Sequence, residues 1–195
     1  MMAWPDIEIF VLAGGKSSRM KCDKGLMLFE GKPMVTHILD TLACNGLSAT
    51  LIANREEYAR LGLNVYKDLI NDKGPMGGLF TALHHTAARA VLLLSSDMPF
   101  LNVDAVKFLA KNCGSEQVTV AQAHQRLYPL LAVYKKTLLT SVKKQIEDNK
   151  LKLTDFILTC NYKICNMDSF TVYNNRMFDN LNTPLDLEKH YASKQ

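Results

Sequence analysis

The sequence predicts an α/β fold built on a doubly wound, mostly parallel and mixed sheet. Two predominantly apolar runs, residues 7–13 and 90–95, each end at residues that break a strand, which is typical of strands buried on both faces of a parallel sheet. Segments with one apolar stripe at helical spacing lie between the strand candidates, as in βαβ units. Residues 117–123 and 127–134 are expected to pair as a hairpin, which makes the sheet mixed.

The other elements are predicted to alternate in the same way. Further strands are predicted over residues 49–53 and 63–66. Helices are predicted from Pro33 to Asn45, over the helix-like residues 55–61, over 77–88, from Asn102 through Ala110, over 136–147, and from Thr183 onward. Residues 140–175 carry no recognisable motif, and no site residue is predicted there.

Composition favours a single domain over residues 1–195, because 48% apolar residues supply one continuous core. The net charge of +4 is mild and spread along the chain, which gives nucleic-acid binding little support. The five cysteines show no C-x-x-C spacing and are expected to be free thiols in a reducing compartment, the cytoplasm. No apolar stretch reaches membrane-spanning length, so no membrane association is expected.

A Gly-rich loop, residues 12–25, follows the first predicted strand. It is not a P-loop, because Phe10 stands where that motif needs its first glycine, and the dinucleotide fingerprint fails because Lys16 follows where a second glycine is required. Its small residues let backbone N–H groups face an anion, and several cations lie beside them. The loop is therefore predicted to bind a triphosphate.

The loop sequence LAGGKSSRMKCDKG resembles the L-A-G-G-x-S-x-R-M-x-x-D-K-G motif of the molybdenum cofactor guanylyltransferase family. Residues 74–79 (GPMGGL), 96–99 (SDMP) and 180–184 (NLNTP) resemble further motifs of that family, in the family's order. The resemblance implies a Rossmann-like fold of the nucleotide-diphospho-sugar transferase type. The chain departs from the family at Lys21, where glycine is usual, and at Tyr128, where His or Gln often precedes the proline.

Asp97 ends a buried strand, so its carboxylate should face the crevice at the carboxyl edge of the sheet. It is predicted to bind Mg²⁺, a role the resemblance also implies, while a turn or cap role is the alternative. Arg19 and Lys24 are predicted to neutralise phosphates, Arg19 through a planar fork and Lys24 through a point charge. Lys24 occupies the position of the family's D-K pair.

The resemblance also implies the residues that bind GTP. The backbone of Leu12, Ala13 and Gly14 is expected to contact guanosine, and Asn54 and Asp68 match nucleotide-binding positions. Either side chain could accept hydrogen bonds from guanine, whose N1–H and amine are donors, although Asp68 could equally be a turn residue. In the same family pattern, Asn180 and Asn182 would face the acceptor or the metal.

The implied reaction transfers GMP from GTP to the phosphate of the molybdenum–molybdopterin cofactor, releases pyrophosphate and depends on Mg²⁺. Cofactor-delivery or molybdoenzyme maturation proteins are the partners that such a product implies. Two alternatives stay open: another nucleotidyltransferase that makes a cytidylyl cofactor or a nucleotide sugar, and a nucleotide-binding module without catalysis. The paired glycines at 14 and 15 favour the guanylyl branch, because cytidylyl relatives tend to read L-A-A-G there.

Overall fold

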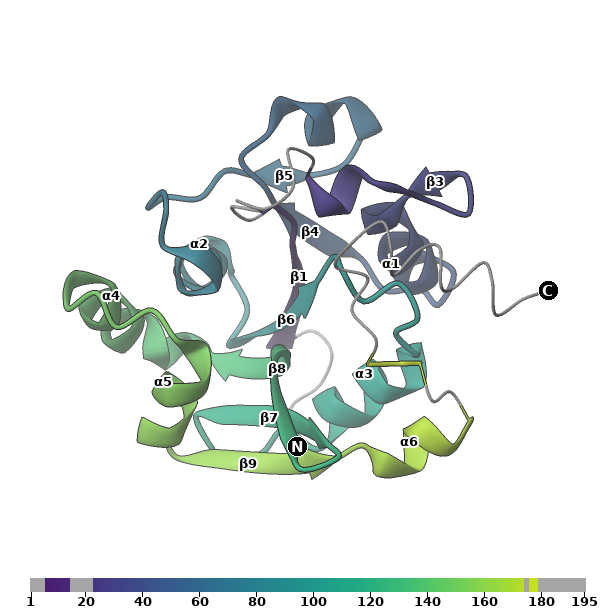
Figure 1. Ribbon diagram of the computed structural model, residues 1–195. Coiled ribbons are helices and arrows are strands. Elements are labelled where there is room, and N and C mark those ends of the chain that lie inside the picture. The colour runs from purple at the N-terminus through teal and green to yellow at the C-terminus, as the bar shows by residue number, and fades with distance from the viewer. Residues whose placement is uncertain (1–5, 15–22, 174–175, 179–195) are drawn as a thin grey trace.

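The computed structural model describes residues 6–14, 23–173 and 176–178, with the side chains of 171–173 left out. One seven-stranded sheet crosses the molecule in the order β5-β4-β1-β6-β8-β7-β9 (Figure 1). Its strands are β1 (Ile7–Leu12), β4 (Ala49–Ile52), β5 (Val65–Tyr66), β6 (Ala90–Ser95), β7 (Val118–Ala123), β8 (Arg126–Lys135) and β9 (Tyr162–Asn166). A separate small hairpin joins β2 (Leu28–Phe29) to β3 (Lys32–Pro33).

One strand of the sheet runs against the others. β1 pairs in parallel with β4 and β6, β4 with β5, and β7 with β9, whereas β8 is antiparallel to both β6 and β7. The β7–β8 pair is the predicted hairpin. The mostly parallel, mixed sheet predicted from the sequence is therefore confirmed.

Helices cover both faces of the sheet (Figure 1). The α-helices are α1 (Met34–Ala43), α2 (Gly74–His85), α3 (Val103–Lys111), α4 (Leu139–Glu147), α5 (Leu153–Thr159) and α6 (Asp168–Tyr173), with short 3₁₀ helices η2 (Lys24–Leu26), η3 (Glu56–Leu61) and η4 (Lys136–Leu138). In the part of the chain that the structure describes, no helix is long and apolar enough to cross a membrane.

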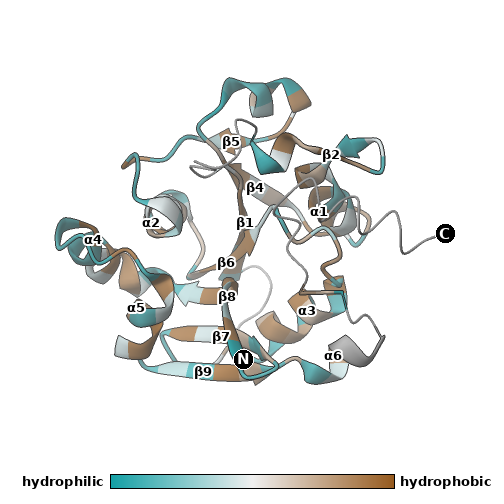
Figure 2. Cartoon of the chain, viewed as in Figure 1, coloured by the Kyte–Doolittle hydropathy of each residue, from teal (hydrophilic) through white to brown (hydrophobic). Residues whose placement is uncertain are grey.

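Two buried clusters follow from the alternation of side chains along the strands. Ile9 and Val11 of β1 pack into one cluster with residues of α1 and α3, whereas Phe10 packs into the other with residues of α2, α4 and α5. Hydrophobic residues make up most of the central strands β1 and β6 (Figure 2). A strand that buries both faces is predominantly apolar, which is the pattern that predicted β1 and β6.

Several predicted elements have other bounds in the structure. The strand predicted over 63–66 is Val65–Tyr66, and the helix predicted over 136–147 begins as the 3₁₀ helix η4. The helix predicted over 77–88 spans Gly74–His85, because Pro75 fits the first turn, where no N–H partner is needed, and because Thr86 takes an extended conformation. Residues 140–175, which carry no recognisable motif, form most of α4 together with α5, β9 and α6. The predicted helix from Thr183 lies outside the described residues.

Candidate active site

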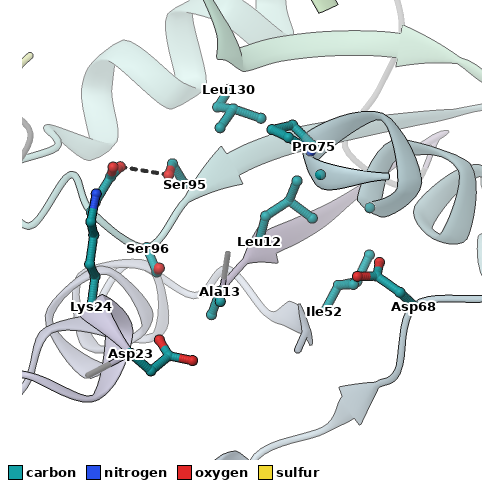
Figure 3. Close-up of a pocket in the computed structure, with 14 residues that line it drawn as sticks. Leu12, Ala13, Asp23, Lys24, Ile52, Asp68, Pro75, Ser95, Ser96 and Leu130 are labelled. Carbon is teal, nitrogen blue, oxygen red and sulfur yellow. Dashed lines mark hydrogen bonds between the residues drawn. The ribbon is translucent and has the colours of Figure 1, made fainter. Parts of the chain in front are cut away.

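A cleft of about 230 Å³ opens at the carboxyl ends of β1, β4 and β6. Figure 3 shows its walls, which come from the ends of these strands, from η2 and from the start of α2. The residues that line it are Leu12, Ala13, Gly14, Asp23, Lys24, Ile52, Asp68, Gly74, Pro75, Gly78, Ser95, Ser96, Asp97 and Leu130. Six of the eight residues predicted to bind GTP, its phosphates or Mg²⁺ are among them: Leu12, Ala13, Gly14, Lys24, Asp68 and Asp97.

The first wall is the backbone that leaves β1. The Ala13 amide donates to the Ile52 carbonyl over 2.9 Å, and the Leu12 carbonyl accepts from the Ser96 amide over 3.0 Å. These bonds tie the strand end to both neighbouring strands. Gly14 follows with a φ of +87°, a conformation that favours glycine because it has no Cβ. The backbone thus turns into the cleft at the point where the predicted phosphate loop begins.

The far end of that loop is fixed by Asp23, a buried carboxylate with three partners. Its Oδ1 accepts from the Gly25 amide over 3.0 Å and from the Tyr58 hydroxyl over 2.6 Å. Its Oδ2 lies 3.6 Å from Nε of Arg55. Burial is the main cause that raises the pKa of Tyr58, and the bond to Asp23 raises it further, so the phenol remains a donor. This network fixes the start of η2 against η3.

Lys24 is placed by that network, because it directly follows Asp23 and begins η2. Its side chain extends toward the end of β6 that carries Ser95 (Figure 3). It therefore brings a positive charge to the cleft wall facing the backbone of β1. Arg19, the other predicted phosphate ligand, lies outside the described residues, as do Asn180 and Asn182.

Asp97 lies just beyond β6 and lines the cleft, as its position after a buried strand predicted. Its Oδ1 accepts a 2.6 Å hydrogen bond from the Ser95 hydroxyl, which orients the carboxylate (Figure 3). No group of three or more His, Cys, Asp or Glu residues in the described ranges could hold a metal ion. A single carboxylate suits Mg²⁺, which typically takes one or two carboxylates together with phosphate oxygens and water.

Asn54 and Asp68 form a reciprocal pair across the ends of β4 and β5. The Asn54 amide nitrogen donates to Asp68 Oδ2 over 2.9 Å, and the Asp68 backbone amide donates to Asn54 Oδ1 over 2.8 Å. Asp68 Oδ1 is buried and has no hydrogen-bond partner among the described residues. The neighbouring Thr81 hydroxyl donates to the Gly77 carbonyl. Burial raises the pKa of Asp68, against the opposing bond from Asn54.

Sequence reasoning missed several residues of this site. Asp23 was included only as part of a motif, without a role of its own. Tyr58 and Arg55 were not predicted as site residues, because they are distant in sequence from the loop residue Asp23 that they contact. Ser95 was predicted only as the end of a strand and Ser96 only as part of a motif, so neither was given a role in the site. The serine that precedes an acid at the end of a buried strand was the available signal for the Ser95–Asp97 bond.

Residues 9–158 match the family described as MobA-like NTP transferase domain. The chain is 34% identical over 180 residues to the probable molybdenum cofactor guanylyltransferase of Flavobacterium johnsoniae, covering 90% of this chain and 95% of that one. It is also 34% identical to the molybdenum cofactor guanylyltransferase of Photobacterium profundum, with 92% of each chain covered.

Solved structures share the fold. Molybdopterin-guanine dinucleotide biosynthesis protein A from Archaeoglobus fulgidus superposes with a TM-score of 0.81 at 21% identity, covering 96% of this chain and 100% of that one. A CMP:2-keto-3-deoxy-manno-octonic acid synthetase complexed with CTP gives 0.75 at 15% identity, over 97% and 98% of the two chains. With the extent of the family match, these findings show that the chain belongs to the MobA-like NTP transferase family and is a nucleotidyltransferase.

Proposed function

We propose that this chain transfers GMP from GTP to the phosphate of the molybdenum–molybdopterin cofactor and releases pyrophosphate. The observation that carries the proposal is the convergence of Gly14, Lys24 and Asp97 on one cleft at the carboxyl edge of the sheet. Relatives named as molybdenum cofactor guanylyltransferases, at about a third identity over most of the chain, support this choice of substrates. Action in the cytoplasm, and transfer of the product to a cofactor-delivery or molybdoenzyme maturation protein, belong to the same proposal.

The triphosphate would lie between the loop and the end of β6. Lys24 and Arg19 supply positive charge for its phosphates, and the backbone after β1 supplies N–H donors. Asp97 would hold Mg²⁺ together with the phosphate oxygens. When bound, the ion would neutralise charge that develops on those oxygens. The Ser95 bond keeps the Asp97 carboxylate oriented toward that position.

The nucleoside would lie along the other half of the cleft. Leu12, Ala13 and Gly14 present backbone to it, and Asn54 and Asp68 lie at the ends of the next strands. The buried Oδ1 of Asp68 is an acceptor without a partner in the described chain. Guanine offers adjacent donors at N1 and the exocyclic amine, so it could satisfy such an acceptor, whereas cytosine lacks an N–H at the equivalent ring nitrogen.

In the proposed reaction an oxygen of the acceptor phosphate bonds to the α-phosphorus of GTP. The bond from that phosphorus to the oxygen bridging to the β-phosphorus breaks, and pyrophosphate leaves with the electron pair. A phosphate monoester is already largely ionised at neutral pH, so no side chain has to remove a proton. The contribution of the protein is alignment and stabilisation of charge, as is usual for phosphoryl chemistry.

Thermal unfolding with GTP, CTP or UTP, each with and without Mg²⁺, tests the donor, because a ligand that binds only the folded state raises stability. The proposal expects the largest shift with GTP and Mg²⁺. Pyrophosphate release with molybdopterin supplied tests the reaction. A larger shift with CTP or UTP would favour a cytidylyl-cofactor or nucleotide-sugar enzyme, and GTP binding without pyrophosphate release would indicate a non-catalytic module.

A further inference from the structure

The reversed strand β8 extends past the end of β6. Its residues 131–135 pair with β6, from Leu131 opposite Leu94 to Lys135 opposite Ala90. Residues 126–128 pair only with β7, beyond a register shift between Val120 and Ala121. Because β8 is antiparallel to β6, this first part of the strand continues beyond the carboxyl end of β6. It therefore lies beside Asp97.

A second cavity, of about 150 Å³, lies at this extension. It is lined by Ser95, Asp97, Met98 and residues 126–130. Ser95, Asp97 and Leu130 also line the nucleotide cleft, so the two cavities adjoin at Asp97. A group held in the second cavity would face the position where Asp97 is proposed to hold the metal and the triphosphate.

Arg126 is the cation among the described residues that line the second cavity. Its guanidinium carbon lies 5.5 Å from the centre of the Tyr128 ring, an arrangement in which the aromatic face attracts the charge. The Tyr128 ring in turn packs against Phe178, with ring centres 4.2 Å apart. Arg126 forms no ion pair with an acid in the described ranges. An exposed guanidinium held beside a cavity in this way is available to an anion.

The tip of the hairpin holds Arg126 at a defined place. His124 and Gln125, the two residues of the turn, have φ values of +49° and +61°. Such two-residue turns usually contain Asn and Gly, because side chains rarely adopt positive φ. The Asp168 carboxylate stabilises the turn, because its Oδ1 accepts a 2.8 Å hydrogen bond from the His124 backbone amide. Backbone strain that a neighbouring element holds in place is characteristic of functional loops.

We propose that Arg126 binds the phosphate of the acceptor and that Tyr128 is a positioning residue for its guanidinium. This inference rests on the proposed function and deepens it, because it assigns the second cavity to a phosphomonoester attached to a planar heterocycle. The acceptor phosphate must approach a triphosphate of like charge, and a guanidinium on its own side offsets that repulsion. The planar fork of arginine also binds a phosphate through two parallel hydrogen bonds. Met98 and Leu127 supply apolar surface for the heterocycle.

The test measures steady-state kinetics with GTP and molybdopterin, and molybdopterin binding without GTP by calorimetry. Arg126→Gln should lower kcat/KM for molybdopterin by about 10- to 100-fold, as expected when a charged hydrogen-bonding partner is lost. Its KM for GTP should not change, because Arg126 does not line the nucleotide cleft. The matched control is Arg89→Gln, an exposed arginine just before β6, at the end of the strand opposite Asp97.

Tyr128 is tested by comparing two replacements. Tyr128→Phe keeps the aromatic face and should leave the molybdopterin Kd unchanged, whereas Tyr128→Leu should weaken it. If Tyr128 acts through Arg126, Tyr128→Leu should raise the molybdopterin Kd little further in a protein that already carries Arg126→Gln. Additive effects of the two replacements would overturn the positioning role.

The outcomes separate this inference from the proposed function. Wild-type turnover together with unchanged molybdopterin kinetics and binding in Arg126→Gln would reject Arg126 and leave the function standing. A wild-type protein that neither binds molybdopterin nor releases pyrophosphate with it would reject both. A parallel rise in the KM for GTP and molybdopterin in Arg126→Gln would reject a selective acceptor site.

Discussion

The buried hydroxyl of Tyr58 donates a 2.6 Å hydrogen bond to Asp23 Oδ1, joining residues 35 positions apart. Asp23 lies near the end of the predicted phosphate loop, and Tyr58 belongs to η3, which follows β4. The same carboxylate accepts from the Gly25 amide. One side chain therefore links the phosphate loop to η3, in the connection between β4 and β5. The position of Lys24 therefore depends on a residue far away in sequence.

Replacing Tyr58 with Phe should lower the free energy of unfolding by about 1–2 kcal/mol, because a buried acceptor loses a donor. It should also raise the Kd for GTP, since Lys24 adjoins Asp23. Urea unfolding and GTP titration measure the two effects. Tyr162→Phe is the control, because the Tyr162 hydroxyl makes no hydrogen bond in the described residues. Equal stability of the two variants would show that the Tyr58 bond does not contribute.

Gly25→Ala should destabilise the fold by about 1–3 kcal/mol through overpacking. A Cβ at this position would overlap the Tyr58 hydroxyl oxygen and approach Ser96 Oγ to 3.3 Å. Combining Gly25→Ala with Tyr58→Phe removes the overlapping oxygen, so the double variant should lose less stability than the sum of the single ones. Urea unfolding of all four proteins completes this cycle, and strict additivity would contradict the proposed overlap.

Asp97→Asn should reduce Mg²⁺-dependent turnover by at least about 100-fold, the scale of losing a charge-stabilising group in an active site. The fold should persist, because an Asn side-chain oxygen can still accept from Ser95. Circular dichroism and pyrophosphate release give the two readouts. Asp104→Asn, in the exposed first turn of α3, controls for loss of charge. Near-normal turnover in Asp97→Asn would remove the metal role from this residue.

Lys24→Ala should lower kcat and raise the Kd for GTP, together reducing kcat/KM by about 10- to 100-fold. The reason is the loss of positive charge from the cleft wall opposite the β1 backbone. Lys111→Ala, at the exposed end of α3, serves as the comparison. Unchanged kinetics in Lys24→Ala would transfer the phosphate role to Lys16 or Lys21.

Asp68→Asn should change how stability depends on pH. Burial raises the folded-state pKa of Asp68, so the folded protein holds this proton more tightly than the unfolded chain. The ionised carboxylate therefore destabilises the fold above the folded-state pKa, and that penalty disappears as the pH falls to the unfolded value of 3.8. Asp68→Asn should be more stable than wild type at pH 7, with a difference that shrinks on acidification.

Chemical unfolding across that pH range checks the prediction. GTP titration of Asp68→Asn at neutral pH should show weaker binding, because an NH2 donor replaces one of the two acceptor oxygens and the negative charge facing the N–H groups of the base is removed. A stability difference that grew toward low pH would contradict the burial penalty on the carboxylate.

The strands that bury both faces could be predicted from the sequence, because such strands are predominantly apolar. β6 has the predicted bounds, and β1 differs only at its end. The edge strand β9 could not be read in this way, because it combines half-buried Lys163 and exposed Ile164 with buried Cys165 and lacks the alternation of a half-buried strand. Its pairing with β7 is a long-range contact that local pattern does not encode.

The candidate site was predictable where a residue ends a strand. Asp97, Asp68 and Gly14 line the cleft because carboxyl ends of parallel strands meet at one edge. The supports of these residues were not predictable. Tyr58 contacts Asp23 through the packing of η3, and Arg126 reaches the cavity beside Asp97 because β8 extends beyond β6.

Because β8 runs against the other strands, the donor and the acceptor would bind to two different parts of the sheet. The donor nucleotide would be handled by the parallel strands β1, β4 and β6, whereas the acceptor would meet one hairpin whose tip pairs only with β7. Substitutions at that tip leave the parallel ladder intact. Acceptor preference can therefore diverge, or be re-engineered by grafting a different hairpin, while the inherited donor chemistry is retained.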